Sequence, residues 1–302
     1  MTSYREEMPN PSILLNPSRS ELRGSNAVLA GRNCSYEVYG FEGNLSIKTV
    51  VSGEAVWQTG KKRTRIDSGT YLVLNHGQRY DIEIRTPKPT QTFCVFFQAG
   101  FVEEIKASLT TQPLEDLRST TVEFSGSPDL YGPVLSPALA RLWNISSQGL
   151  LSSESGHEGF RDVAEALLVA QGLARDQIDR VPLCNSAARE EVAERLQQAK
   201  ELILDSYSKE LSLERMAAEA CLSPHHFHHL FKQSYGLTPY RLLTDRRLER
   251  ARRLLLEGHD SVEAVCTKVG YSSTSSFAKL FRRRFGLLPS QVRQESEDST
   301  LT

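Results

Sequence analysis

Four histidines in one short segment are the residues of this chain whose types and spacing most directly suggest chemistry. They stand with a lysine, in the order His225, His226, His228, His229 and Lys232. An imidazole can donate to or accept from the edge of a nucleic-acid base, and an ammonium group pairs with a phosphate. His225 and His229 also have the spacing of two metal ligands on a helix, but the sequence places no third ligand beside them. A solvated helix face is the third interpretation.

An apolar stripe within the same segment places these histidines on a helix. Phe227, Leu230 and Phe231 stand at positions i, i+3 and i+4, so they form one face that we expect to be buried. The histidines and the lysine then lie on the exposed faces of the helix.

The same plan occurs a second time farther along the chain. Phe277, Leu280 and Phe281 repeat the stripe, and Phe227 and Phe277 are 50 residues apart. Each copy shows a short helix, a tight turn and a second helix, which is the plan of a helix-turn-helix. The residues expected to face DNA in the second copy are Thr274, Ser275, Ala278, Lys279, Arg282, Arg283 and Arg284. The short side chains among them predict weaker base readout, and the arginines predict phosphate contact or solvation.

Capping residues indicate where these helices begin and end. Ser212 can cap a helix, and Ser223-Pro224 and Thr238-Pro239 each put a hydroxyl before a helix and proline at its first position. Gly236 and Gly286 stand where a left-handed cap is expected. Between the copies, residues 239–257 predict a linking helix of about 27 Å at the helical rise per residue. Two readers, which are the second helices of the two helix-turn-helix units, lie ~34 Å apart when they enter successive major grooves of DNA.

Charge separates this region from the rest of the chain. Residues 221–293 hold 13 Lys and Arg against five Asp and Glu, although the whole chain has a net charge of −1. A basic segment is what phosphate binding requires. Some arginines of the linking helix must instead pair with Asp245, Glu249 and Glu257.

Residues 189–295 resemble the C-terminal domain of the AraC/XylS family of bacterial transcription regulators. The second copy carries the resemblance in Cys266-x-x-x-Gly270-Tyr271-Ser272 and in Phe277-x-x-x-Phe281-Arg282-x-x-Phe285-Gly286-x-x-Pro289-x-x-x-Arg293. The linking helix adds Arg247-Leu248-x-x-Ala251-x-x-Leu254-Leu255, where a structural role for Arg247 and a phosphate contact stay equally open. Cys266 stands where the family usually has Ala, and it should pack as a small apolar residue. The resemblance implies that His225, His228 and His229 point at base edges and that Lys232 contacts phosphate.

Residues 13–97 show short β-type runs separated by turn residues. Ala27–Ala30 and Ser35–Tyr39 are two such runs, and Tyr80–Ile84 and Thr92–Phe97 are two more. Turn glycines recur at the ~8–12-residue spacing of sandwiches and barrels. We therefore expect an α+β chain: an N-terminal antiparallel β-barrel with helices, cupin-like by resemblance, and then an all-α domain of two helix-turn-helix units joined by a long helix.

The predicted organisation has two domains. Residues 1–183 form a sensing and dimerisation domain with helices at 129–145 and 159–178, and residues 184–188 form a linker. Residues 189–295 form the DNA-binding domain, and residues 296–302 form an acidic tail.

Barrels of this kind bind ligands at the mouth, so aromatic and polar residues of the strands are pocket candidates. The candidates are Trp57, Arg63, Tyr71, His76 and Tyr80, with simple packing or surface exposure as the alternative. His76 is the single histidine of residues 1–156, which is too few for a cupin metal site. We therefore expect no catalytic residue, no metal and no cofactor.

Composition sets the broad class of the protein. The chain has 302 residues, 39% hydrophobic and 24% charged, as expected for a soluble protein of about two domains. Its apolar stretches fall short of the ~18 residues of a membrane span, and its polar start lacks the layout of a signal peptide. Its five cysteines are scattered, which favours the cytoplasm.

These observations predict a cytoplasmic, sequence-specific DNA-binding transcription regulator, and the resemblance favours an activator over a repressor. The expected partners are double-stranded DNA, an unknown small-molecule effector, RNA polymerase and a second copy in a homodimer, with no membrane. Two alternatives stay open. One is a ligand-independent regulator controlled by abundance or by a protein partner, and the other is a cupin-type enzyme fused to a DNA-binding domain.

Overall fold

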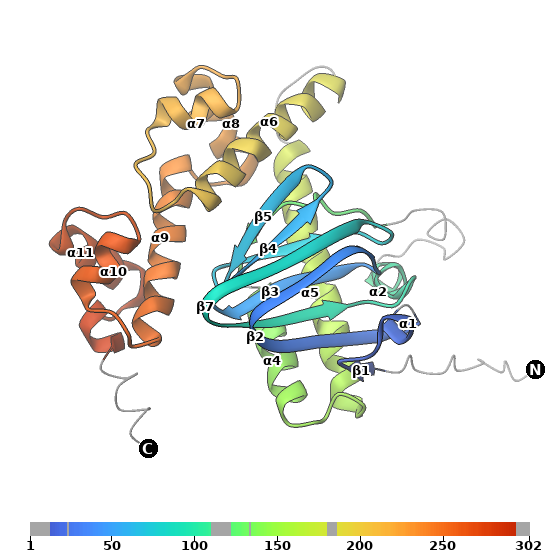
Figure 1. Ribbon diagram of the computed structural model, residues 1–302. Helices are drawn as coiled ribbons and strands as arrows, with labels where there is room; N and C mark the ends of the chain where they lie inside the picture. Colours follow the sequence, from blue (N-terminus) through green and yellow to red (C-terminus); the bar gives the residue numbers. More distant parts are fainter. Residues whose placement is uncertain (1–12, 23, 110–121, 133, 180–185, 294–302) are drawn as a thin grey trace, which may run out of the picture. The chain divides into compact units, whose positions relative to one another are not determined.

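The computed structural model describes residues 13–22, 24–109, 122–132, 134–179 and 186–293. The chain divides into two compact units, residues 1–172 and residues 173–302 (Figure 1). Residues 184–185 of the predicted linker and the acidic tail 296–302 lie outside the described residues, while residues 186–188 begin helix α6 (Ser186–Asp205). The predicted domain boundary therefore stays a prediction.

The N-terminal unit is built on one mostly antiparallel sheet. Its strands are β1 (Ile13–Leu15), β2 (Asn26–Glu42), β3 (Ser46–Ser52), β4 (Glu54–Thr59), β5 (Lys62–Asp67), β6 (Thr70–Leu74), β7 (Arg79–Phe96) and β8 (Asp129–Leu130). The order is β1-β2-β7-β3-β6-β8, and β4 and β5 form a hairpin that joins the sheet at β7. The short β1–β2 pair is parallel. The unit also contains helices α1 (Arg19–Leu22) and α2 (Phe101–Leu109).

Strand β7 is the centre of this sheet. It pairs with β2 along most of its length, with β3 near its end and with β4 near its start. The sequence predicted two separate strands within β7 and two within β2, but each pair forms one long strand. Pro87 and Pro89 are tolerated because the register with β2 steps from Thr90 to Arg85, so these residues lie at a bulge where no ladder N–H is needed.

The predicted α+β class and antiparallel sheet are confirmed, but the sheet is not closed into a barrel. Among the described residues, the hydrogen-bonded path ends at β1 and β8, and the β4–β5 hairpin leaves it as a branch. Both end strands are very short, with three and two residues. Register shifts on β7 near Pro87 and on β2 between Val38 and Phe41 bend the long strands, so the sheet curls without its edges meeting.

The strands bury side chains on both faces of the sheet. On β7, Phe93 and Val95 enter one core cluster, and Cys94 and Phe96 enter the other. The first cluster lies against helices α2, α4 (Leu135–Ser147) and α5 (Glu154–Asp179). The predicted helix at 129–145 begins later than expected, at Leu135, because Asp129 and Leu130 pair with β6. The second cluster lines the concave side of the curled sheet.

The C-terminal unit is helical, as predicted. After α6 come α7 (Leu213–Glu219), α8 (Pro224–Tyr235), α9 (Pro239–Leu256), α10 (Val262–Lys268) and α11 (Thr274–Phe285). The predicted caps are confirmed: the hydroxyls of Ser212, Ser223 and Thr238 accept from backbone N–H groups of the first turns of α7, α8 and α9. Gly236 and Gly286 end α8 and α11 in the left-handed conformation.

Two helix-turn-helix units therefore stand on either side of α9. In the second unit, Phe277 and Phe281 of α11 pack with Leu248, Ala251 and Leu255 of α9. Cys266 belongs to the same cluster, so it packs as a small apolar residue in the way its type predicted.

Candidate DNA-binding surface and ligand cavity

Helix α8 has the two-sided character expected of a reading helix. Phe227, Leu230 and Phe231 are buried. The predicted contact residues around them are exposed at His225, His226, His229 and Lys232, and partly buried at His228. The helix is therefore anchored by its phenylalanines, and its exposed surface carries imidazoles and an ammonium group.

Helix α11 repeats this arrangement with different side chains. Phe277 and Phe281 are buried, and Leu280 packs against the same cluster. The exposed predicted contacts are Thr274, Ser275, Lys279, Arg282 and Arg283. The hydroxyl of Ser275 lies 3.1 Å from that of Ser273, which caps the helix. The exposed side chains of α11 are thus short at the start of the helix and basic at its end.

The three consecutive arginines of α11 do not have the same surroundings. Arg284 lies 3.3 Å from the carboxylate of Glu249 and 3.8 Å from that of Asp245, both on α9. Asp245 also accepts from Arg241 at 2.9 Å. Arg284 therefore joins the second reader to the linking helix, while Arg282 and Arg283 stay exposed for phosphate or solvent.

Two arginines of α9 have structural roles that sequence reasoning left open or missed. Arg246 is 3% exposed, donates to the carbonyl of Leu204 at 3.2 Å, and stacks its guanidinium 4.4 Å from the ring centre of Tyr207. Arg247 donates to the carbonyls of Tyr207 and Lys209 at 2.7 and 2.9 Å. Burial lowers the pKa of Arg247 from its ordinary value.

Arg247 also stands at the meeting point of the two helix-turn-helix units. Gly270, in the turn of the second unit, has a φ of +90°. A Cβ atom there would lie 2.8 Å from the carbonyl oxygen of Ser208 and 3.0 Å from Nη2 of Arg247. The loop after α6, the linking helix and the second turn therefore meet too closely for any residue but glycine.

Comparison with known proteins agrees with this geometry. A family model described as a helix-turn-helix domain matches residues 216–295. The virulence regulon transcriptional activator VirF of Yersinia enterocolitica is 26% identical over 244 residues, which are 81% of this chain and 87% of VirF. The transcriptional activator RhaS of Klebsiella pneumoniae (strain 342) is 37% identical over 100 residues, which are 33% of this chain and 36% of RhaS. The chain carries an AraC/XylS-type DNA-binding domain.

Among solved structures, ToxT from Vibrio cholerae O395 covers 87% of this chain and 95% of its own, at 13% identity and a TM-score of 0.34. The predicted identity of the AraC/XylS-type domain thus rests on the sequence matches and on the two helix-turn-helix units described above. Which side chains of the domain touch DNA stays a prediction.

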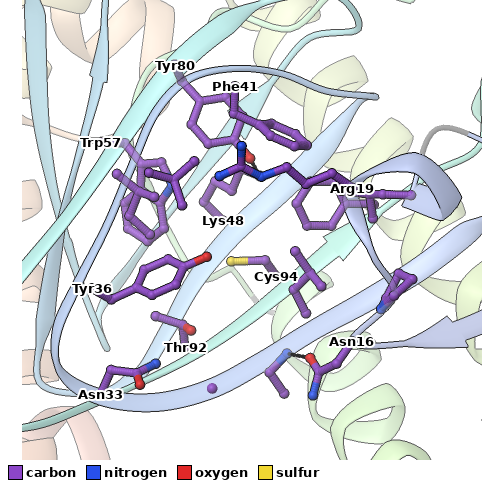
Figure 2. Close-up of a pocket in the computed structure, with 18 residues that line it drawn as sticks. Asn16, Arg19, Asn33, Tyr36, Phe41, Lys48, Trp57, Tyr80, Thr92 and Cys94 are labelled. Carbon is purple, nitrogen blue, oxygen red and sulfur yellow. Dashed lines mark hydrogen bonds between the residues drawn. The ribbon is translucent and has the colours of Figure 1, made fainter.

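The N-terminal unit contains a cavity on the concave side of the sheet. Its volume is about 260 Å³, close to the lower end of the range for small-molecule sites. Figure 2 shows the lining residues, which come from β2, β3, β4, β7 and the segment around α1. Five aromatic side chains line the walls: Tyr36, Phe41, Trp57, Tyr80 and Phe96.

Two of the five predicted pocket residues line this cavity. Trp57 and Tyr80 are buried in its wall. Arg63 lies elsewhere, on the surface, where it donates to Glu83 at 2.9 Å. Tyr71 is buried on the helix-covered face of the sheet, beside Tyr131. Successive residues of a strand face opposite sides of the sheet, and Tyr71 falls on the side away from the cavity. His76 is exposed in the turn after β6.

The residue of greatest chemical interest in the cavity was missed from the sequence. Lys48 of β3 is 1% exposed. The available signal was a single lysine inside the β-type run Leu45–Val51, which a surface strand would place outward. Because both faces of β3 are buried, the lysine points into the cavity instead.

The described residues contain no group of three or more His, Cys, Asp and Glu side chains able to hold a metal ion. No helix in those parts of the chain has the length and apolarity needed to cross a bilayer.

Proposed function

We propose that this DNA-binding transcription regulator is an activator without catalytic activity, whose N-terminal unit receives the controlling signal. The observation that carries the proposal is the pair of reading helices, each anchored by buried phenylalanines and each exposing polar side chains within a basic segment. VirF and RhaS are named transcriptional activators, which favours activation.

On α8, we propose that His225, His228 and His229 read base edges and that Lys232 binds phosphate. On α11, Thr274, Ser275 and Lys279 face the bases, and Arg282 and Arg283 hold phosphates. This assignment is supported by their exposure opposite the buried stripes. His226 is exposed near the start of α8 and is assigned to the flank of the same contact.

The signal is proposed to be a small molecule bound in the N-terminal unit, whose layout is similar to cupin-like effector domains. The cavity around Trp57 and Tyr80 supports a ligand over control by abundance alone. RNA polymerase, a cytoplasmic location and a homodimer complete the proposal. The apolar faces of α4 and α5 pack against the sheet, so the dimer contact uses other surfaces of this unit.

Selection of genomic DNA fragments by the purified full-length protein tests the proposal. The salt concentration is set high enough to suppress non-specific binding. We expect a discrete sequence motif that is relaxed by His225→Ala and by His229→Ala. His76→Ala, which changes an exposed histidine of the N-terminal unit, is the matched control and should leave the motif intact. Recovery of fragments without any shared motif would contradict sequence-specific regulation.

Sedimentation of the same protein tests the homodimer. We expect a species of twice the mass of the chain, 33.8 kDa, at micromolar concentration. A single species at the mass of one chain would remove the dimer from the proposal.

A further inference from the structure

The ammonium group of Lys48 lies in aromatic surroundings, and no carboxylate among the described residues that line the cavity pairs with it. It donates to the hydroxyl of Tyr80 at 2.8 Å, and it lies 4.3 Å from the ring centre of Tyr80 and 3.8 Å from that of Phe96. Aromatic faces attract a cation, but they do not neutralise it. A buried charge of this kind is costly unless an opposite charge pairs with it.

The charge of the cavity wall is one-sided. Besides Lys48, the wall includes the guanidinium of Arg19, which lies 5.7 Å from the ring centre of Phe41. Among the described residues that line the cavity there is no Asp and no Glu. The remaining polar groups are the amides of Asn16 and Asn33 and the hydroxyls of Tyr36, Tyr80 and Thr92. The cavity wall therefore carries basic side chains and no carboxylate that could neutralise them.

We propose that the cavity binds a small organic anion, a carboxylate carried on an apolar body, and that Lys48 pairs with the carboxylate. This inference rests on the proposed function, since it names the chemical class of the effector. The body of the ligand packs against Trp57, Phe41 and Phe96, which bury apolar area without demanding further hydrogen bonds.

Pairing with a carboxylate changes the protonation of Lys48. Burial lowers the pKa of this amine to about 7. The other groups that face it are Tyr80 and Cys94 of β7, Tyr36 of β2 and Arg19 of α1. Burial raises the pKa of Tyr80 and of the Cys94 thiol above their ordinary values, so both stay neutral near neutral pH. A bound carboxylate favours the ammonium form, so binding above neutral pH takes up a proton on Lys48.

Matched acid and amide probes test the charge requirement. Titration calorimetry on the full-length protein compares phenylacetate with phenylacetamide, and hexanoate with hexanamide, near pH ~6.5, where most of the Lys48 population is protonated. At least one carboxylate should bind ~10-fold or more tightly than its amide. Lys48→Met keeps the apolar stem and removes the charge, so it should abolish this preference. Arg63→Met removes an exposed cation outside the cavity and should preserve it.

A second measurement needs no variant and so does not depend on the folding of Lys48→Met. Calorimetry at about pH 8, in buffers of different ionisation enthalpy, counts the protons taken up on binding. We expect uptake approaching one proton per site at that pH and clearly less at about pH 6. Equal affinity for acids and amides, failure of every probe to bind at millimolar concentration, or no proton uptake at the higher pH would each overturn the proposal. Selection of DNA by the unliganded wild-type protein is scored separately, so loss of the effector inference is distinguishable from loss of the proposed function.

Discussion

Single residues carry the chemistry of this protein, and Lys48 also makes its stability depend on pH. The folded-state pKa of Lys48 is about 7, against an ordinary value of 10.5. Between these values the unfolded chain holds a proton that the folded chain lacks, so stability rises with pH across this window. Above the unfolded-state pKa the amine is neutral in both states, so its burial costs no stability. As the pH falls from there to about 7 the folded state loses stability progressively, and the loss is complete below about 7.

Lys48→Met should therefore stabilise the N-terminal unit most at and below neutral pH. Its advantage over the wild type should shrink by at most about 1.4 kcal/mol per pH unit as the pH rises above about 7. Both tryptophans, Trp57 and Trp143, lie in this unit, so denaturant unfolding followed by tryptophan fluorescence measures it. Lys61→Met, at an exposed lysine, is the control. An advantage of Lys48→Met that is independent of pH would show that the amine is not buried as a titrating group.

The exposed residues of α8 should separate into two kinds when changed singly. His229→Ala should relax sequence preference at one or two base positions. The variant should lose about 1–3 kcal/mol of the binding free energy that separates the correct base from a wrong one. Lys232→Ala should weaken binding to every sequence alike and lower the slope of affinity against salt by ~1. Quantitative binding to a set of single-base variants of the selected site, at several salt concentrations, measures both effects. Uniform weakening by His229→Ala would place this imidazole on the backbone instead.

At the scale of elements, the close approach around Gly270 predicts unequal costs for two glycine substitutions. Gly270 and Gly286 both have positive φ, at +90° and +78°, but no heavy atom lies within 4 Å of a Cβ built at Gly286. Gly286→Ala should therefore cost about 1–2 kcal/mol of stability, which is the strain of the left-handed conformation alone. Gly270→Ala should cost more, because its Cβ also meets the backbone of Ser208.

Thermal unfolding of the two variants, followed by the helical circular dichroism signal, measures this difference. Equal costs would mean that the loop after α6 moves freely away from the second turn. A larger cost at Gly270, with weaker DNA binding in folded protein, would show that this contact sets the orientation of the readers.

The elements also show what the sequence could and could not predict. The Phe stripes, the caps at Ser223 and Thr238 and the end at Gly286 depend on neighbours within a turn or two, so local spacing predicted them. The merging of strands into β7, the open sheet and strand β8 depend on pairing across long separations. The orientation of Lys48 could not be predicted either, because a strand buried on both faces cannot be recognised from the alternation of apolar and polar residues alone. Arg284 pairs with α9 through a contact 35 residues away in the chain.

At the scale of the DNA-binding unit, the linking helix fixes how far apart the two readers act. Helix α9 has 18 residues, so it is about 27 Å long. We expect the selected site to contain two recognised halves about one helical turn, ~34 Å, apart. His229→Ala should relax one half and Lys279→Ala the other. Selected-site sequencing with both variants measures this, and relaxation of the same half by both would mean that a single reader contacts the bases.

Strand β7 separates the cavity on one face of the sheet from helix α4 on the other. Cys94 faces the ligand cavity, while Phe93, its neighbour in the chain, packs edge-to-face on Trp143 of α4. The strand that lines the cavity is thus also the strand on which α4 packs. We expect a molecule that displaces β7 to disturb the packing of α4 through Phe93 and Trp143, and a protein that binds α4 to disturb the same strand. We therefore expect the filling of the cavity and the position of α4 to be coupled through β7.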